Sequence, residues 1–225
     1  MEICRYNREK MKIEIWSDIM CPFCYIGKRK FENALAQFDH KNEVTVEWKS
    51  FQLNPNLVTD ISINTIQHLA ESKGWTMDYT NQSIQHVTDV ATEVGLHFDF
   101  EKAVVANSFD AHRLLHLAKK HKLQNQCKEL LLAAYFTEGK NTADHEVLKN
   151  IGLQIGLDAN EISNVLESNQ YADEVNNDIH HAQEIGVRGV PFFVLANKYA
   201  ISGAQSSETF LAALTQTWNE TVIVK

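Results

Sequence analysis

Alternation of hydrophobic and polar positions predicts two strands and an intervening helix at the start of the chain. Residues 12–17 (KIEIWS) are rich in β-branched and aromatic side chains, which is typical of a short strand. After Pro22, apolar side chains recur at helical spacing as far as Phe38, and proline is common in the first turn of a helix. Residues 44–51 alternate apolar and polar positions, which indicates a strand with one wet face. The order β-α-β predicts a parallel strand pair with a right-handed crossover.

The central part of the chain, from Asn54 to about Gly186, has mostly helical periodicity. Apolar stripes stop at glycines such as Gly95 and Gly139, and glycine commonly follows the last turn of a helix. A crossover between parallel strands needs only about a dozen residues, and this segment is far longer. We therefore expect residues 56–170 to form an inserted, all-helical domain.

The last part of the chain returns to strand-like patterning. Residues 190–196 and 199–203 flank Asn197 and Lys198, and asparagine tolerates the left-handed conformation of tight turns. A final amphipathic helix follows. The patterns predict an α/β protein in the order β-α-β, helical insert, α-β-β-α. Its discontinuous α/β domain is expected to comprise residues 11–55 and 171–219, and residues 1–10 are expected to be a short N-terminal extension.

Composition and charge narrow the possible functions. The chain has 44% hydrophobic and 22% charged residues, as globular proteins do. Its formal charge is −8, which disfavours nucleic-acid and membrane partners; the basic cluster at residues 28–30 is expected on the solvated face of a helix. No apolar run approaches the ~18–20 residues of a membrane helix. The first twelve residues lack the apolar stretch of a secretory signal and cysteines are few, so we expect a cytoplasmic protein.

The sequence Cys21-Pro22-Phe23-Cys24 lies between the first predicted strand and helix. At a helix N-terminus, unpaired N–H groups and the macrodipole favour negative charge. We therefore expect Cys21 to ionise more readily than a free cysteine, and the thiolate is the attacking species. Cys24 follows one turn later, where it can attack a mixed disulfide formed at Cys21. A CxxC motif beside a β-α-β pattern is a redox signature.

Other interpretations of the cysteine and histidine residues are weaker. A closed zinc site needs four ligands, and Cys4 and Cys127 are isolated in the sequence. His112 and His116 lie one helical turn apart, but no third ligand is evident, so we expect no metal site. Cys127 falls on the apolar stripe of its predicted helix and is expected to be a core thiol. Cys4 is expected to be exposed and incidental.

Five motifs resemble those of the DsbA-family thioredoxin-fold oxidoreductases, in particular the FrnE-like cytoplasmic branch. They are SDIMCPFCYIGK (17–28), FQLNP (51–55), NSFDAHRL (107–114), GVRGVPFFV (186–194) and ISGAQ (201–205). They occur in the family's order and span almost the whole chain. The resemblance implies a thioredoxin-like fold interrupted by a large helical insertion domain, in agreement with the periodicity.

The resemblance also bears on the surroundings of the cysteine pair. It implies that the Val190-Pro191 bond is cis, that Pro191 packs against the pair, and that the backbone of Val190 pairs with the substrate chain. Phe23 departs from the CPHC sequence of the strongly oxidising periplasmic members. A histidine there lends positive charge to the thiolate, whereas phenylalanine cannot, so we expect a less acidic Cys21 and a less oxidising couple. Asp18 has three open interpretations: it opposes thiolate formation, relays a proton, or is a solvated loop carboxylate.

The sequence thus predicts a thiol-disulfide oxidoreductase that oxidises, reduces or isomerises disulfides in proteins or small molecules. The predicted catalytic residues are Cys21 and Cys24, framed by Pro22, Phe23, Val190 and Pro191. No bound cofactor or metal is required; glutathione or another thiol is the expected redox partner, and the protein is expected to be a monomer or a homodimer. The alternative is a glutathione-dependent isomerase or transferase of the same fold, which typically carries serine in place of Cys21. A third interpretation is a non-enzymatic scaffold or chaperone.

Overall fold

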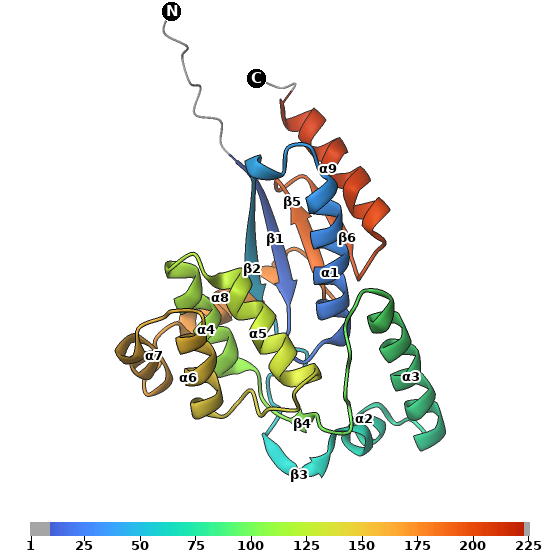
Figure 1. Cartoon of the computed structure of the whole chain (residues 1–225), viewed down its shortest axis with the longest axis vertical. Coiled ribbons are helices and arrows are strands. Elements are labelled where there is room, and N and C mark those ends of the chain that lie inside the picture. Colours follow the sequence, from blue (N-terminus) through green and yellow to red (C-terminus); the bar gives the residue numbers. More distant parts are fainter. Residues whose placement is uncertain (1–9, 223–225) are drawn as a thin grey trace, which may run out of the picture.

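Four strands form a mixed β-sheet through the middle of the molecule (Figure 1). The computed structural model describes residues 10–222, so Cys4 and residues 1–9 of the predicted extension lie outside the described residues. The strand order is β2-β1-β5-β6, with β1 at Met11–Ser17, β2 at Val44–Ser50, β5 at Phe192–Leu195 and β6 at Tyr199–Ser202. β1 runs parallel to β2 and antiparallel to β5, and β5 is antiparallel to β6. The predicted strands at both ends of the chain are confirmed.

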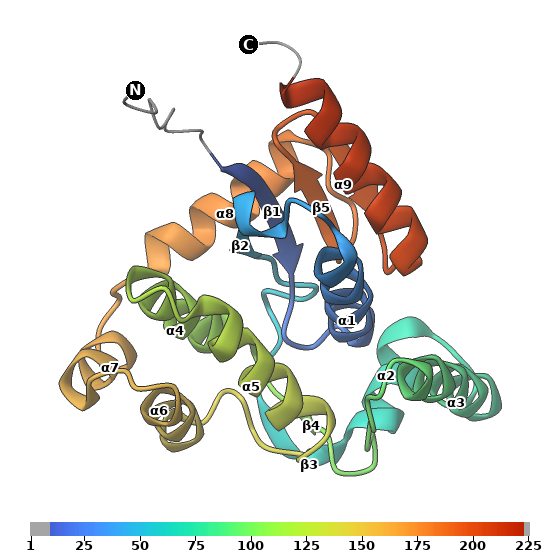
Figure 2. The same ribbon diagram turned by 45° about the horizontal axis from the view of Figure 1, so that its top comes forward.

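One face of the sheet is covered by α1 (Pro22–Gln37) and α9 (Ser207–Val222) (Figure 2). Phe193 of β5 lies at the centre of this layer, with its ring 5.5 Å from that of Phe31 and 4.6 Å from that of Phe210. All three side chains are almost fully buried. The helical spacing of apolar residues after Pro22 therefore marks the face of α1 that packs on the sheet.

The opposite face of the sheet receives α8 (Ala172–Glu184). Trp16 points to this side and packs against Ala182. Its indole Nε1 donates a 2.9 Å hydrogen bond to the carbonyl of Asp178. A 3₁₀ helix, Lys41–Glu43, connects α1 to β2. The sheet is thus held between helices from both ends of the chain.

The turn between β5 and β6 has the predicted asparagine in a left-handed conformation. Leu195 pairs with Tyr199, so the turn contains three residues. Ala196 and Asn197 have φ values of 50° and 53°, and Lys198 N donates a 2.9 Å hydrogen bond to the carbonyl of Leu195. The predicted hairpin is confirmed.

The insert is mainly helical and also contains a small sheet that the periodicity did not indicate. Its elements are β3 (Asp60–Asn64), α2 (Thr65–Lys73), α3 (Met77–Glu93), β4 (Val104–Val105), α4 (Phe109–Lys120), α5 (Gln124–Phe136), α6 (His145–Gln154) and α7 (Ala159–Leu166). β3 and β4 pair antiparallel. Ile61 and Ile63 of β3 are exposed, so this strand has no buried face that a sequence pattern would reveal. The exact domain boundaries stay predictions.

Local signals start several helices of the insert. The Asp144 carboxylate accepts backbone hydrogen bonds at the start of α6, and the Asp158 carboxylate does so at the start of α7. Such N-caps satisfy N–H groups that the helix leaves unpaired. Among the described residues, no helix is long and apolar enough to cross a membrane.

A charge cluster around the buried Lys28 joins α1 to α5. Lys28 is only 2% exposed, and its Nζ lies 2.7 Å from a carboxylate oxygen of Glu32 and 2.7 Å from one of Glu129. Glu129 also pairs with Arg29 and accepts a 2.6 Å hydrogen bond from the hydroxyl of Tyr25. The expectation of a solvated basic face was wrong for Lys28. Its partner Glu129 comes from a distant helix, which local periodicity cannot indicate.

Candidate active site

The cysteine pair lies where β1 leads into α1. Cys21 is the N-cap residue of α1, with φ −95° and ψ 112°, and Pro22 is the first helical residue. Cys24 N donates a 3.0 Å hydrogen bond to the carbonyl of Cys21, so Cys24 is one turn further along. Both thiols are free; Cys21 is 4% exposed and Cys24 is fully buried. Cys21 is therefore the sulfur nearer to solvent.

A loop before β5 lies against the pair. The Val190-Pro191 peptide bond is cis, and the Cys21 thiol donates a 3.4 Å hydrogen bond to the carbonyl of Val190. Pro191 lies against α1 at Gly27, where an added Cβ would be only 2.9 Å from Pro191 Cγ and 3.4 Å from Ala204 Cβ. The glycine in the CPFCYIG segment is thus what allows α1 and the proline loop to approach so closely.

Phe23 and Pro22 form the outward side of the same turn. Phe23 is 40% exposed, whereas Pro22 is partly covered. An exposed aromatic ring beside a thiol pair gives the rim of the site an apolar surface. The four residues predicted to frame the pair therefore all lie on the two segments that meet at Cys21.

Asp18 is buried and is contacted by residues of two of the sequence motifs, 51–55 and 107–114. It is 1% exposed; its Oδ2 accepts a 2.7 Å hydrogen bond from Leu53 N, and its Oδ1 lies 3.4 Å from Nε2 of His112. Burial opposes ionisation, but the bonds from His112, Leu53 and Ser108 outweigh it and lower the pKa of Asp18. The interpretation of Asp18 as a solvated loop carboxylate is therefore wrong.

Lys128, on α5, is a member of the site that the sequence reasoning missed. Its side chain is fully buried. Nζ donates a 3.3 Å hydrogen bond to the carbonyl of Ser17 and lies 5.6 Å from the ring centroid of Trp48. Burial lowers the pKa of Lys128 to about 8, although the negative charge on Cys24 opposes this change. A sequence signal did exist, because Lys128 falls in line with apolar Leu132 at helical spacing.

The Cys21 and Cys24 thiols influence each other's ionisation. Burial opposes the ionisation of Cys24, but the neighbouring Cys21 thiol and the charge of Lys128 lower its pKa. The pKa of Cys21 is raised well above its usual value by its hydrogen bond to Cys24, by burial and by the charge on Cys24. This order is the reverse of the one expected from the helix N-terminus alone. Ionisation of one thiol therefore makes ionisation of the other less favourable, and the two groups titrate as a coupled pair.

The two histidines that lie one turn apart on α4 have different partners. His112 faces Asp18, and burial lowers the pKa of its ring, so the ring is neutral near pH 7. His116 Nε2 lies 3.2 Å from the Ser50 hydroxyl and 3.3 Å from Asp178 Oδ2. Within residues 10–222, no cluster of three or more His, Cys, Asp or Glu side chains could hold a metal ion.

The third buried thiol has no comparable environment. Cys127 is fully buried in the core of the insert, which confirms its predicted position. Burial raises its pKa to about 12, and the neighbouring charge of Lys128 opposes this only weakly. A thiol with such a pKa is almost entirely protonated and unreactive near neutral pH.

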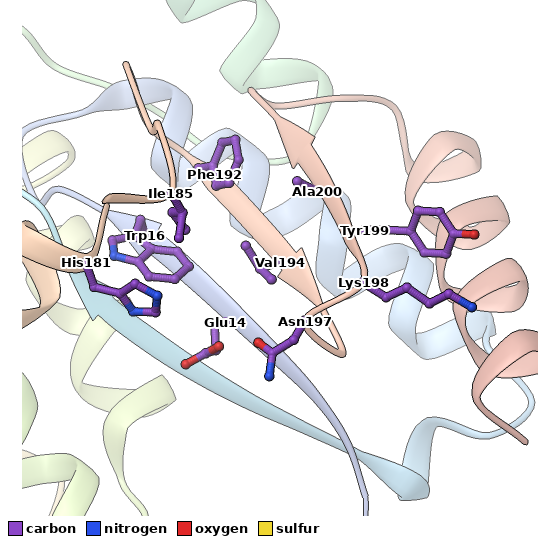
Figure 3. A pocket seen from close by; sticks show the side chains of 10 residues that line it. All are labelled: Glu14, Trp16, His181, Ile185, Phe192, Val194, Asn197, Lys198, Tyr199 and Ala200. Carbon is purple, nitrogen blue, oxygen red and sulfur yellow. The ribbon is translucent and has the colours of Figure 1, made fainter. Parts of the chain in front are cut away.

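A separate groove of about 390 Å³ opens on the sheet face that also carries α8 (Figure 3). Trp16, Phe192 and Val194 form its apolar floor, and His181 and Lys198 lie at its edges. None of the predicted site residues lines it. The groove is thus distinct from the surroundings of the cysteine pair.

A thiol pair at the start of a helix, facing a proline loop beside a mixed sheet, defines a thioredoxin-fold protein with a helical insertion. Residues 12–215 match the family model described as "DSBA-like thioredoxin domain", and the chain belongs to this family.

Individual relatives cover nearly the whole chain. A Bacillus subtilis (strain 168) protein, "Uncharacterized protein YwbO", is 29% identical over 214 residues, 90% of this chain and 94% of that protein. A crystal structure of "probable DsbA oxidoreductase SCO1869" from Streptomyces coelicolor has 37% identity and a TM-score of 0.87, covering 93% of this chain and 91% of that one. The cytosolic disulfide reductase DsbM from Pseudomonas aeruginosa has a TM-score of 0.60 and covers 94% and 98% of the two chains. At 14% identity, it shows the fold alone.

Proposed function

We propose that this protein is a thiol-disulfide oxidoreductase in which Cys21 and Cys24 alternate between the dithiol and the disulfide. The observation that carries the proposal is the placement of the pair: Cys21 caps α1, Cys24 follows one turn later, and Val190 contacts the Cys21 sulfur. The Streptomyces relative that is named a probable DsbA oxidoreductase supports the same activity.

The reaction consists of two thiol-disulfide exchanges. The Cys21 thiolate attacks one sulfur of a substrate disulfide, which forms a mixed disulfide and releases the other substrate sulfur as a thiolate that takes up a proton. The Cys24 thiolate then attacks the Cys21 sulfur and releases the second substrate thiol. The substrate gains two electrons, and the protein is left with a Cys21-Cys24 disulfide. The reverse sequence oxidises a substrate dithiol.

The coupled ionisation of the two thiols fits this order of events. Cys21 is the less buried sulfur, so it is the one that a substrate reaches first. When the Cys21 proton moves to Cys24, the charge is on the attacking sulfur. After the mixed disulfide forms, Cys24 ionises again beside Lys128 and resolves it.

The rim of the site fits an extended chain that carries the disulfide. By the family resemblance, the backbone of Val190 pairs with the substrate, and Pro191 holds that segment beside Cys21. Exposed Phe23 then packs against apolar substrate side chains next to the disulfide. Either a protein or a small-molecule disulfide satisfies these contacts.

The cycle needs an external thiol, for which we propose glutathione or a dithiol reductant. Two glutathione molecules supply the two electrons and two protons that return the disulfide to the dithiol, and they leave as glutathione disulfide. We place the protein in the cytoplasm, in the FrnE-like branch, as a monomer or a homodimer with no bound cofactor. In a reducing compartment, reduction and isomerisation are the favoured directions.

The test is turnover of a disulfide peptide with glutathione as reductant, in parallel with conjugation of glutathione to an electrophile. We expect disulfide reduction that Cys21→Ser abolishes and Cys127→Ala leaves intact. Conjugation that survives Cys24→Ser, without disulfide turnover in the unmodified protein, would instead establish the glutathione-dependent transferase. The presence of both Cys21 and Cys24 favours the redox activity.

A further inference from the structure

We propose that Lys128 is a positioning residue whose buried ammonium group holds the single negative charge of the Cys21-Cys24 pair and thereby favours the reduced form. The inference rests on the proposed function and adds a tuning residue to it. Lys128 lies more than one hundred positions after the pair in the sequence and belongs to the helical insert.

The burial of Lys128 demands a negative partner. Its side chain is fully buried, and within residues 10–222 no carboxylate lies within ion-pairing distance of its Nζ. The contacts that the structure gives it are the carbonyl of Ser17, at 3.3 Å, and the face of Trp48. A neutral carbonyl and an aromatic face offset only part of the free energy lost when an ammonium group leaves water.

The thiol pair and the Asp18 carboxylate are the anions that act on Lys128, and Cys24 acts more strongly than Asp18. Asp18 is charged, but its oxygens are bound to Leu53 N and His112. Ser17 connects Lys128 to the pair, because its carbonyl binds the ammonium group and it is the last residue of β1, on the segment that leads to Cys21 at the start of α1. The titratable groups that influence Lys128 or are influenced by it are Cys21, Cys24, Asp18, His112 and Cys127.

Two contacts of α5 fix Lys128 in place. One helical turn earlier, the Gln124 side chain accepts a 2.9 Å hydrogen bond from Trp48 N and donates a 2.8 Å bond to the carbonyl of Trp48. The next residue, Glu129, binds α1, the helix that carries Cys24. The ammonium group therefore stays in place when the charge of the thiol pair changes. A charge that is held in place in this way can stabilise the thiolate electrostatically.

The effect on the redox equilibrium has a definite sign. The thiolate exists only in the reduced protein, and the disulfide carries no charge. A fixed positive charge therefore stabilises the reduced form relative to the oxidised form, and removing it shifts the equilibrium toward the disulfide. By linkage, Lys128 must also bind its proton more tightly in the reduced protein than in the protein with the Cys21-Cys24 disulfide.

The experiment is Lys128→Met, because methionine has a similar length and fills the same buried space without the charge. We expect the equilibrium with glutathione to shift at least about tenfold toward the disulfide, which corresponds to about 30 mV. The thiolate absorbance of the pair should also titrate at higher pH. Lys149→Met, the same change at a partly exposed position on α6 of the insert, should leave both readouts unchanged.

A second measurement uses the unmodified protein and does not depend on the variant folding. The Nζ of Lys128, followed by NMR with labelled lysine, should titrate at lower pH in the disulfide form than in the dithiol form. Equal titration in both forms, or a Lys128→Met variant with unchanged redox equilibrium and thiolate titration, overturns the inference. Absence of any dithiol-disulfide transition in the unmodified protein overturns the proposed function instead.

Discussion

The start of α1 and the middle of α5 both carry buried sulfur, yet their chemistry differs. Cys21 and Cys24 lie at a helix N-terminus, next to each other and within the field of Lys128. Cys127 is enclosed by apolar side chains of the insert, and burial raises its pKa to about 12. The comparison shows that burial alone suppresses the ionisation of a thiol. A buried thiol pair becomes reactive only where fixed charges and hydrogen bonds offset the loss of water.

The two regions also contribute different groups to the site. The α/β domain supplies the sulfur atoms and the proline loop, and the insert supplies the positive charge. Asp18, at the end of β1, adds a buried negative charge that raises the pKa of Cys21. The charge balance at the pair is therefore set by opposing contributions from the two regions.

The largest effect is expected from Cys24→Ser compared with Cys127→Ala. Without Cys24, no internal thiol can resolve a mixed disulfide at Cys21. In a single turnover with no external thiol present, the Cys24→Ser variant should therefore keep one half of the substrate covalently attached, whereas the unmodified protein releases both halves. Cys127→Ala should neither trap substrate nor slow turnover. Mass spectrometry of each variant shows whether substrate is attached and to which cysteine, and release of the reduced peptide measures turnover. Substrate attached at Cys127 would contradict the contrast between the two regions.

Alanine substitution at one glycine in each region distinguishes effects on the active site from effects on the packing of the insert. Alanine at Gly27 forces Pro191 away from α1, because its Cβ would lie 2.9 Å from Pro191 Cγ. We expect turnover to fall about tenfold or more, since misplacement by about 1 Å can reduce rates about a hundredfold.

The matched change is Gly152→Ala, whose Cβ would lie 2.6 Å from Ile162 Cδ1 within the insert. Overpacking typically costs about 1–3 kcal/mol, partly offset by the better helix propensity of alanine. The midpoint of thermal unfolding should therefore fall, while turnover per folded molecule stays the same. Loss of turnover in Gly152→Ala, with Gly27→Ala unaffected, would reverse the account.

Asp18→Asn tests the negative side of the charge balance. Asparagine can still accept the hydrogen bond from Leu53 N, but the charge that raises the pKa of Cys21 is gone. The thiolate should form at lower pH, and the equilibrium with glutathione should shift toward the dithiol, by less than about tenfold, or about 30 mV. This sign is opposite to that of Lys128→Met. A shift in the same direction for both variants would contradict the opposing roles.

The smallest effect on activity is expected at the cluster that joins the two regions. Burial opposes the ionisation of Glu129, but the hydrogen bond from Arg29 and the charge of Lys28 lower its pKa to about 2. A carboxylate whose pKa is lower in the folded state stabilises the fold above its unfolded pKa, near 4.5. That contribution is lost as the pH falls toward about 2.

Glu129→Gln should therefore lower the free energy of unfolding by about 1–3 kcal/mol at neutral pH. The difference from the unmodified protein should shrink between pH 4.5 and about 2. Glu146→Gln, at an exposed position on α6, is the control. Chemical denaturation at several pH values measures this, and a difference that persists undiminished at the lowest pH would contradict the assignment.

Local sequence was sufficient for the four strands of the main sheet, most helices and the cysteine pair, but not for β3 and β4. The spacing after Pro22 gave α1, Asn197 marked the hairpin turn, and the position of Cys21 before the helix gave its N-cap role. Each of these depends on neighbours within a few residues, which is the range that periodicity and turn chemistry describe.

Distant contacts could not be predicted in this way. The burial of Lys28 follows from Glu129, that of Asp18 from Leu53 and His112, and the ionisation order of the thiols from Lys128. Each partner lies in a segment that only the fold brings close. The electrostatics of the site therefore had to come from the structure.

The most direct test of the central claim is a titration with glutathione buffers of different potential, in which each cysteine is alkylated and quantified in its own peptide. Cys21 and Cys24 should lose reactivity together in a single two-electron transition, and Cys127 should show no transition. Oxidation of Cys21 without Cys24, ending in a stable glutathione adduct, or no transition at either residue, would contradict the account.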